Sequence, residues 1–274
     1  MSVNRFTVLG GAGFIGSHLI QHLIRDGHDY WAPGRREPLG AQPLGHVIYC
    51  IGLTADFRQR PLETVEAHVC VLRRLLEQGN FTSLTYLSST RVYAGSGDTR
   101  EDGSLVVNPN VSGDLYNLSK LMGESLCLHG GHPRARVARL SNIVGLRPDP
   151  DIFIDQLLEE GARTGHVRLQ TSLDSCKDYL CIDDAVRMLV CIAASSVGGV
   201  INVASGQSVS NHAILSMLSQ YLGFSFDVVP DAPAWEFQSI DITRLRTEFN
   251  FSPRAFEDYF PEFLYQYRNK KGHS

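Results

Sequence analysis

The sequence lacks several features that would assign it to common classes of protein. No apolar run approaches the ~20 residues that a helix needs to cross a bilayer. Its six cysteines are scattered and form no C-x-x-C pair, which favours reduced thiols over a disulfide framework. A net charge of −4 gives no attraction to nucleic acid or to an anionic membrane, so we expect neither as a partner.

Targeting and metal-binding patterns are missing as well. The start, MSVNRFTVLGG, shows no signal peptide ahead of its strand-like run, so we expect a cytoplasmic protein. Among the ten histidines, His18 and His22 are four residues apart but lack the glutamate of a zinc-protease motif, and His129 and His132 flank two glycines. None of these forms a convincing ligand set, so we expect no metal site.

The 274 residues, 43% of them hydrophobic, fit one large α/β domain with a small added lobe. In the first half, strand-like runs alternate with helical patterns. The strand-like runs cover 6–10, 29–32, 46–52, 84–89 and part of 134–145, and the helices 62–79 and 113–128. A further helix follows residue 13, with an apolar stripe of Ile15, Leu19, Ile20, Leu23 and Ile24. This alternation predicts a Rossmann-type, doubly wound parallel sheet.

The second half is less regular. We expect helices near 152–161, 182–194 and 211–222, and strands at 166–170 and 200–204. The pattern predicts a first domain over residues 1–146, to which some later segments return. Residues 147–274 then form, for the most part, a smaller C-terminal lobe that binds the substrate.

A glycine-rich loop follows the first strand. Gly10, Gly13 and Gly16 have the spacing G-x-x-G-x-x-G, and the helix begins around Phe14 and Ile15. The first glycine allows a tight turn, the second lets the backbone approach a pyrophosphate, and the third lets the helix pack against the sheet. We expect these five residues to hold a dinucleotide at the helix N-terminus.

The end of the second strand bears on the choice of dinucleotide. NAD sites commonly have an acidic residue there, which binds the ribose 2′-hydroxyl. Here Gly34 stands at that place, beside Arg35 and Arg36. Guanidinium groups suit a 2′-phosphate, which favours NADP and leaves NAD possible, although both arginines could equally be solvated surface residues. The segment from Pro33 to Gly45 is too short to hold a helix and a strand.

Tyr116 and Lys120 are four residues apart on a predicted helix and therefore share one face. A tyrosine with its ordinary pKa of about 10 is a poor proton shuttle at neutral pH. We expect the ammonium group of Lys120 to lower that pKa, so that Tyr116 exchanges a proton with a sugar hydroxyl or ketone.

The order of motifs resembles a known family. GGAGFIG, LSSTRVY, YNLSK, RLSNIVGLR and KDYLCIDDAV follow one another as in the extended short-chain dehydrogenases/reductases. More narrowly, the chain resembles the NAD(P)-dependent epimerase/dehydratase group, which modifies nucleotide sugars. The resemblance implies that Tyr116 is the catalytic acid or base, that Lys120 is its partner and binds the cofactor ribose, and that Ser89 is the catalytic hydroxyl. It also implies that Ser89, Thr90 and Asn142 contact the nucleotide sugar.

The chain departs from this family at several places. The 4,6-dehydratases carry Asp-Glu directly after the catalytic hydroxyl, where this chain has Thr90 and Arg91. Without those carboxylates we do not expect dehydratase chemistry. His68 replaces the asparagine that the family usually has in the helix after the fourth strand. The short segment between Pro33 and Gly45 removes part of the usual adenine wall.

Three functions stay open. The first is an NADPH-dependent reductase that acts on the keto group of a nucleotide-linked deoxysugar, with Tyr116 as proton donor. The second is a nucleotide-sugar 4-epimerase that retains NAD. The third is a non-catalytic NADP(H) sensor, which would have no need for the catalytic residues. The resemblance further implies a homodimer formed by the helices at 62–79 and 113–128.

Overall fold

A computed structural model describes residues 5–54, 56–147, 152–235 and 237–272. The chain divides into two compact units. The first comprises residues 1–141, 182–203 and 241–252, and the second comprises residues 142–181, 204–240 and 253–274. The first stretch of unit 1 therefore ends at Ser141 rather than at the expected residue 146, because the strand that begins at Asn142 pairs within unit 2.

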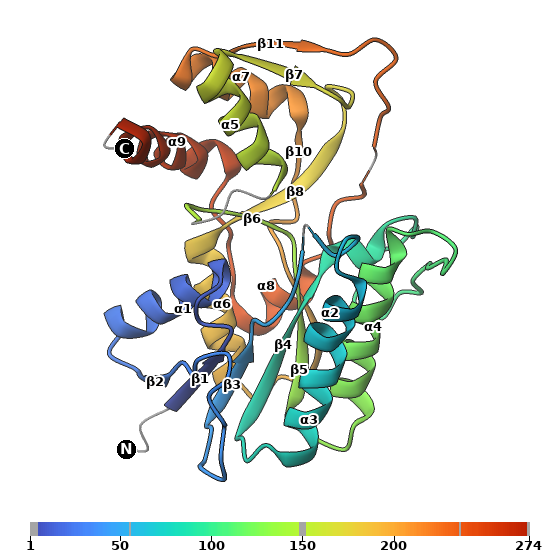
Figure 1. Ribbon diagram of the computed structural model, residues 1–274, viewed down its shortest axis with the longest axis vertical. Coiled ribbons are helices and arrows are strands. Elements are labelled where there is room, and N and C mark those ends of the chain that lie inside the picture. Colours follow the sequence, from blue (N-terminus) through green and yellow to red (C-terminus); the bar gives the residue numbers. More distant parts are fainter. Residues whose placement is uncertain (1–4, 55, 148–151, 236, 273–274) are drawn as a thin grey trace. The chain divides into compact units, whose positions relative to one another are not determined.

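Unit 1 is built on a six-stranded, entirely parallel sheet in the order β2-β1-β3-β4-β5-β9. Its strands are β1 (Arg5–Leu9), β2 (Asp29–Trp31), β3 (His46–Tyr49), β4 (Ser83–Ser89), β5 (Ala135–Leu140) and β9 (Gly199–Val203). One face is covered by α1 (Phe14–Arg25) and α6 (Ile182–Ala194), and the other by α2 (Pro61–Val65), α3 (Val71–Gln78) and α4 (Asp114–His129) (Figure 1). A further helix, α8 (Thr243–Phe249), contacts β9. The predicted doubly wound Rossmann-type fold is confirmed.

Burial on both faces explains the apolar strands. All six residues of β5 are buried, as are the first six of β4, so that only Ser89 at its end is partly exposed. In α1, Leu19 and Leu23 are fully buried, and burial of each side chain contributes about 1.5–3 kcal/mol to the free energy of folding. The expected stripe was wrong at its end: Ile24 is 57% exposed, because it lies in the last turn of the helix, away from the sheet.

The helix predicted over 62–79 is interrupted. Between α2 and α3 the chain forms a π-helical turn, η1 (Glu66–Cys70), with His68 fully buried inside it. π-turns are rare and occur often at functional sites. The apolar spacing of the sequence indicates a helix but carries no signal for this wider turn.

No helix or strand occurs between Trp31 and His46, all of which the structure describes, as the shortness of this segment predicted. The segment makes turns instead, and in one of them the Gly34 N–H donates to a Glu37 carboxylate oxygen at 2.9 Å. A carboxylate therefore lies just beyond the end of β2.

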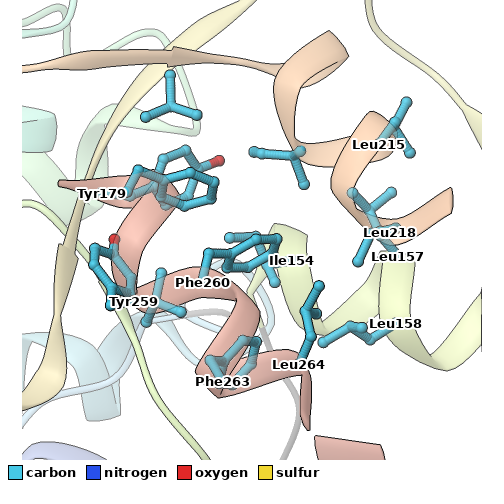
Figure 2. Packing of buried hydrophobic residues seen from close by; sticks show 14 of the residues in the cluster. Ile154, Leu157, Leu158, Tyr179, Leu215, Leu218, Tyr259, Phe260, Phe263 and Leu264 are labelled. Carbon is cyan, nitrogen blue, oxygen red and sulfur yellow. The ribbon is translucent and has the colours of Figure 1, made fainter. Parts of the chain in front are cut away.

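In its described residues, unit 2 contains two small sheets and three helices. The strands β6 (Asn142–Val144), β8 (Cys176–Cys181) and β10 (Ser208–Ser210) form one sheet, and β7 (His166–Leu169) and β11 (Ser225–Val228) form the other. The helices are α5 (Phe153–Thr164), α7 (Asn211–Leu222) and α9 (Phe256–Gly272). Their apolar faces meet in one core, where Ile154, Leu218 and Phe260 are at most 1% exposed (Figure 2).

None of the six cysteines, all of which the structure describes, forms a disulfide. Within the described part of the chain, no helix combines the length and the apolar character that crossing a membrane requires.

Candidate functional site

The site begins at the edge of the large sheet where its parallel strands end. The register pairs Leu9 of β1 with Tyr49 of β3, and Tyr49 with Tyr86 of β4. The residues that follow β1 and β3, and the end of β4, therefore lie along one edge. Carboxyl ends of parallel strands are where α/β sheets bind ligands.

The glycine loop after β1 has the geometry that its spacing predicted. Gly10 has a φ of +84°, and a Cβ placed on it would lie 3.0 Å from the Cys50 carbonyl. A Cβ on Gly16 would lie 2.3 Å from the Gly10 oxygen, so only glycine lets the helix pack this closely. A Cβ on Gly13 would meet only the Gly10 oxygen, at 3.3 Å, on the side open to solvent.

This loop fits an anionic dinucleotide. Gly13 is the exposed N-cap of α1, a helix of twelve residues with no acidic side chain in its first turn. The N–H groups of the first turn and the positive end of the helix dipole favour a phosphate there. Phe14 and Ile15, half-buried in that turn, are the first side chains beside it. Their contact with a cofactor remains a prediction.

Arg35 and Arg36 are exposed in the turn after β2. In the described chain neither makes an ion pair, so both are available to an external phosphate. The carboxylate of Glu37, one residue further on, is held by the Gly34 N–H. The position of Gly34 alone predicts no acid after β2, but the turn brings the carboxylate of Glu37 back to the Gly34 N–H.

Ser89 and Tyr116 lie near each other in the folded chain. Ser89 ends β4 and caps the 3-10 turn η2 (Thr90–Tyr93), where its hydroxyl accepts from the Arg91 N–H at 3.2 Å. Tyr116 lies in the first turn of α4 and is 5% exposed, and the Ser89 side chain is close enough to lower the pKa of its hydroxyl. The two hydroxyl groups therefore share one environment, and their joint role in catalysis stays a prediction.

The electrostatics of Tyr116 differ from the expectation. Burial raises the pKa of its hydroxyl above the usual value, while the Ser89 hydrogen bond and the charge of Arg91 oppose that rise. Arg91 is the cation that acts on this pKa, whereas the Lys120 Nζ donates to the Leu87 carbonyl at 2.9 Å and lies 5.8 Å from the centre of the Tyr116 ring. Burial also lowers the pKa of Lys120 to about 7. The tyrosine is thus held protonated at neutral pH.

Arg91 is the residue that sequence reasoning undervalued. The sequence indicates only that Arg91 stands where a dehydratase has a carboxylate. In the structure, its guanidinium carbon lies 5.4 Å from the centre of the Tyr116 ring. The available signal was its position two residues after Ser89, in the turn that follows β4. It is the cation whose charge acts on the phenol.

His68 ties three segments of the site together. Its Nε2 accepts from the Leu53 N–H at 3.2 Å, so its proton lies on Nδ1, which donates to the Ser119 hydroxyl at 2.8 Å. Its ring also meets Tyr116 edge to face, with ring centres 5.4 Å apart. Burial and the charge of Lys120 lower the pKa of His68 to about 2, so the ring stays neutral.

A buried ion pair links the end of β4 to β5 and α4. Arg139 donates to both carboxylate oxygens of Glu124, at 2.6 and 3.0 Å, and both side chains are about 5% exposed or less. Ser88 donates to the same carboxylate at 2.5 Å. Ser88 is therefore tied to this ion pair, and Glu124 fixes α4 one turn beyond Lys120.

The two remaining predicted substrate contacts lie in different units. Thr90 is 9% exposed within η2, and its contact with substrate stays a prediction. Asn142 belongs to unit 2, where its amide donates to the Asp178 carbonyl at 2.8 Å. The Asp178 carboxylate accepts backbone N–H groups of residues 205–207 and so holds a turn. In the described residues, no three His, Cys, Asp or Glu side chains come together as metal ligands would.

Known proteins similar to this chain are enzymes that act on nucleotide sugars. Residues 6–204 match the model of the NAD dependent epimerase/dehydratase family. The chain is 28% identical over 260 residues to a GDP-6-deoxy-D-mannose reductase from Pseudomonas aeruginosa, covering 83% of each chain. It is 30% identical over 238 residues to a dTDP-glucose 4,6-dehydratase from Streptomyces griseus, covering 81% of this chain and 70% of the relative.

Among solved structures, the UDP-glucuronic acid 4-epimerase of Bacillus cereus, in complex with UDP-glucuronic acid and NAD, superposes with a TM-score of 0.79. That match covers 97% of this chain and 99% of the other at 22% identity, and it supports the fold. With the glycine loop, the Ser89–Tyr116 pair and a family match over most of its length, the chain belongs to the NAD-dependent epimerase/dehydratase family of nucleotide-sugar enzymes.

Proposed function

We propose that the chain is a reductase that converts a keto group of a nucleotide-linked sugar, such as a keto-deoxysugar, to a hydroxyl group. The observation that carries this proposal is the buried Tyr116 side chain, which lies beside Ser89 and whose hydroxyl burial keeps protonated by raising its pKa. A reductase needs an acid at this place, whereas oxidation of an alcohol needs the phenolate from the start.

In the reaction, a reduced nicotinamide supplies the hydride when it is bound. Tyr116 gives its phenolic proton to the carbonyl oxygen, so that the C=O bond becomes CH–OH. The Ser89 hydroxyl bonds the same oxygen and orients it. The phenolate that forms on Tyr116 is stabilised by the charge of Arg91 and by the Ser89 hydrogen bond, since both lower the pKa of that hydroxyl.

The chain's own residues are poorly suited to dehydration. Eliminating water from the sugar needs a carboxylate pair next to the catalytic hydroxyl, and Thr90 and Arg91 occupy those places. A guanidinium group cannot take up the proton that such an elimination releases, because it is always protonated in proteins.

For the cofactor we propose NADP, held at the glycine loop and selected by Arg35 and Arg36. The two exposed guanidinium groups suit the 2′-phosphate. Lys120, which lies next to the end of β3, would hydrogen-bond the nicotinamide ribose.

A 4-epimerase with retained NAD is the second candidate, and Glu37 favours it. Its carboxylate lies at the end of β2, where an acid binds the ribose 2′-hydroxyl of NAD. Replacing Arg35 and Arg36 by alanine distinguishes the two cofactors: loss of NADPH affinity with unchanged NADH affinity supports NADP. Glu37→Gln, in contrast, should weaken only the binding of NADH.

The proposed function is tested by following NADPH oxidation with a panel of 4-keto nucleotide sugars. We expect oxidation with at least one member and a fall of about 10²–10⁴-fold in kcat for Tyr116→Phe, since that is what one acid contributes. Purified protein that retains a nicotinamide cofactor and only interconverts epimers would favour the epimerase. If cofactor binds but no keto sugar is bound or turned over, the protein is a sensor and the enzymatic proposal fails.

We also propose a homodimer in which α2, α3 and α4 pair with their copies. Leu62 on α2 is 80% exposed and Met122 on α4 is 53% exposed, on neighbouring helices. Apolar side chains left in water on adjacent helices are typical of a surface that another chain covers.

A further inference from the structure

Two arginines meet beside the catalytic tyrosine without a carboxylate between them. Arg58, in the loop after β3, has its guanidinium carbon 4.7 Å from the centre of the Phe57 ring, and Arg91 lies 5.1 Å from the same centre. The Phe57 ring is buried and lies 5.4 Å from the ring of Tyr116. Phe57 and Tyr116 therefore form an aromatic floor under both guanidinium groups.

The two cations also converge at one point of the backbone. A Cβ placed on Gly113 would lie 3.3 Å from Arg91 Nη2 and 3.5 Å from Arg58 Nη2. Arg91 Nη2 also donates to the Gly113 carbonyl at 3.3 Å, which anchors one of the two groups. The donors of both side chains thus face the same small space in front of α4.

This arrangement carries an electrostatic cost. Arg91 is half-buried, and burial together with the charge of Arg58 lowers its pKa. In the part of the chain that the structure describes, neither arginine is ion-paired. Asp56, the nearest acid in sequence to Arg58, pairs with Arg60 instead.

The acidic side chain nearest to Arg91 is also engaged elsewhere. Asp114 acts on Arg91 through its charge, but its two oxygens accept from the Asn108 N–H at 2.8 Å and the Asn117 amide at 3.0 Å. Like charges held together at a partly buried place, with their nearest acids occupied, are stabilised when an external anion binds between them.

We propose that Arg58 and Arg91 form a two-arginine site for an oxyanion of the substrate, next to the Tyr116 hydroxyl. Guanidinium groups bind carboxylate and phosphate oxygens in a planar, two-pronged manner, and the aromatic floor restricts their rotation. The inference rests on the proposed nucleotide-sugar function. Such a substrate offers two oxyanions: the diphosphate that every nucleotide sugar carries, and the carboxylate of an acidic sugar.

Calorimetric titration tests the site on the full chain saturated with NADPH. The ligands are inorganic pyrophosphate, UDP-glucose and UDP-glucuronic acid, the last two differing by one carboxylate. The variants are Arg58→Met, which alters an exposed side chain, and Arg91→Lys, which keeps the charge and removes the planar fork. Arg73→Met on α3, which removes an exposed arginine remote from Tyr116, is the matched control.

We expect Arg58→Met to weaken binding about tenfold or more, since hydrogen bonds to charged groups have that effect, and Arg73→Met to leave it unchanged. Equal weakening for both sugars and for pyrophosphate assigns the site to the diphosphate. Weakening confined to UDP-glucuronic acid assigns it to the sugar carboxylate. The proposal is overturned if both variants bind all three ligands with the affinity of the unaltered chain, or if the substitutions weaken only the binding of NADPH.

Failure of the proposed function gives a different result. No UDP-, GDP- or dTDP-linked sugar would then bind the unaltered chain, while pyrophosphate binding would still depend on Arg58 and Arg91 if the anion site exists.

Discussion

His68 makes the stability of this protein depend on pH in a way that one substitution removes. The folded chain holds its ring neutral, with a pKa of about 2, whereas the unfolded chain protonates it below the ordinary value of about 6.5. Stability from this group is therefore fully present above pH 6.5 and is lost as the pH falls from 6.5 toward 2. In that window the unfolded state binds one more proton than the folded state.

The magnitude follows from the same two values. Each pH unit inside the window changes the free energy of unfolding by about 1.4 kcal/mol. Between pH 7 and pH 5, His68 alone should therefore destabilise the folded chain by about 2 kcal/mol. His22 and His46 also have lowered pKa values, so they steepen the profile of the unaltered chain and of a His68 variant alike.

The assay is urea unfolding at pH 7 and pH 5 for the unaltered chain and for His68→Gln. An amide at this position can still accept from the Leu53 N–H and donate to Ser119. We expect the stability difference between the two pH values to be about 2 kcal/mol smaller in His68→Gln. His129→Gln, which alters an exposed histidine, is the control and should match the unaltered chain. Parallel profiles for the unaltered chain and His68→Gln would refute the burial argument.

Three further predictions follow from the geometry. Gly16→Ala should destabilise the fold by about 1–3 kcal/mol in chemical denaturation, because its Cβ would collide with the Gly10 oxygen. Gly13→Ala should fold normally and weaken the binding of NADPH. Equal stabilities for the two variants would contradict this. Lys120→Met should abolish turnover and yet raise the free energy of unfolding at pH 7 by about 1–4 kcal/mol. The substitution removes a buried ammonium group, and it leaves Glu124 paired with Arg139. A lowered melting temperature would count against that. Met122→Glu should shift the chain from dimer to monomer in sedimentation velocity, and an unchanged mass would rule out the helical-face dimer.

Much of the fold could be predicted because its signals are local. The continuous apolar strands, the glycine loop and the Tyr116–Lys120 spacing depend on neighbouring residues and on one periodicity, and all appear where expected. The short strands of unit 2, β8, β10 and β11, were not predicted. They are three to six residues long, and their pairing partners are distant in sequence.

The site was less predictable because its electrostatics depend on contacts across the fold. Spacing places Lys120 on the same helical face as Tyr116 but does not reveal that Lys120 bonds the Leu87 carbonyl. The π-turn that buries His68 and the approach of Arg58 to Arg91 likewise come from segments that meet only in the folded chain. Residue identity was sufficient to propose the catalytic positions, whereas their charge environment required coordinates.

Transfer of label from the cofactor tests the central claim most directly. The protein is given a keto nucleotide sugar and NADPH carrying deuterium at the transferable position of its nicotinamide, and the sugar product is examined by mass spectrometry and NMR. A reductase in which Tyr116 supplies the proton predicts deuterium on the new carbinol carbon, one NADP⁺ released per sugar, and loss of both in Tyr116→Phe. A sugar that changes only its configuration, without label and without consuming NADPH, would contradict it.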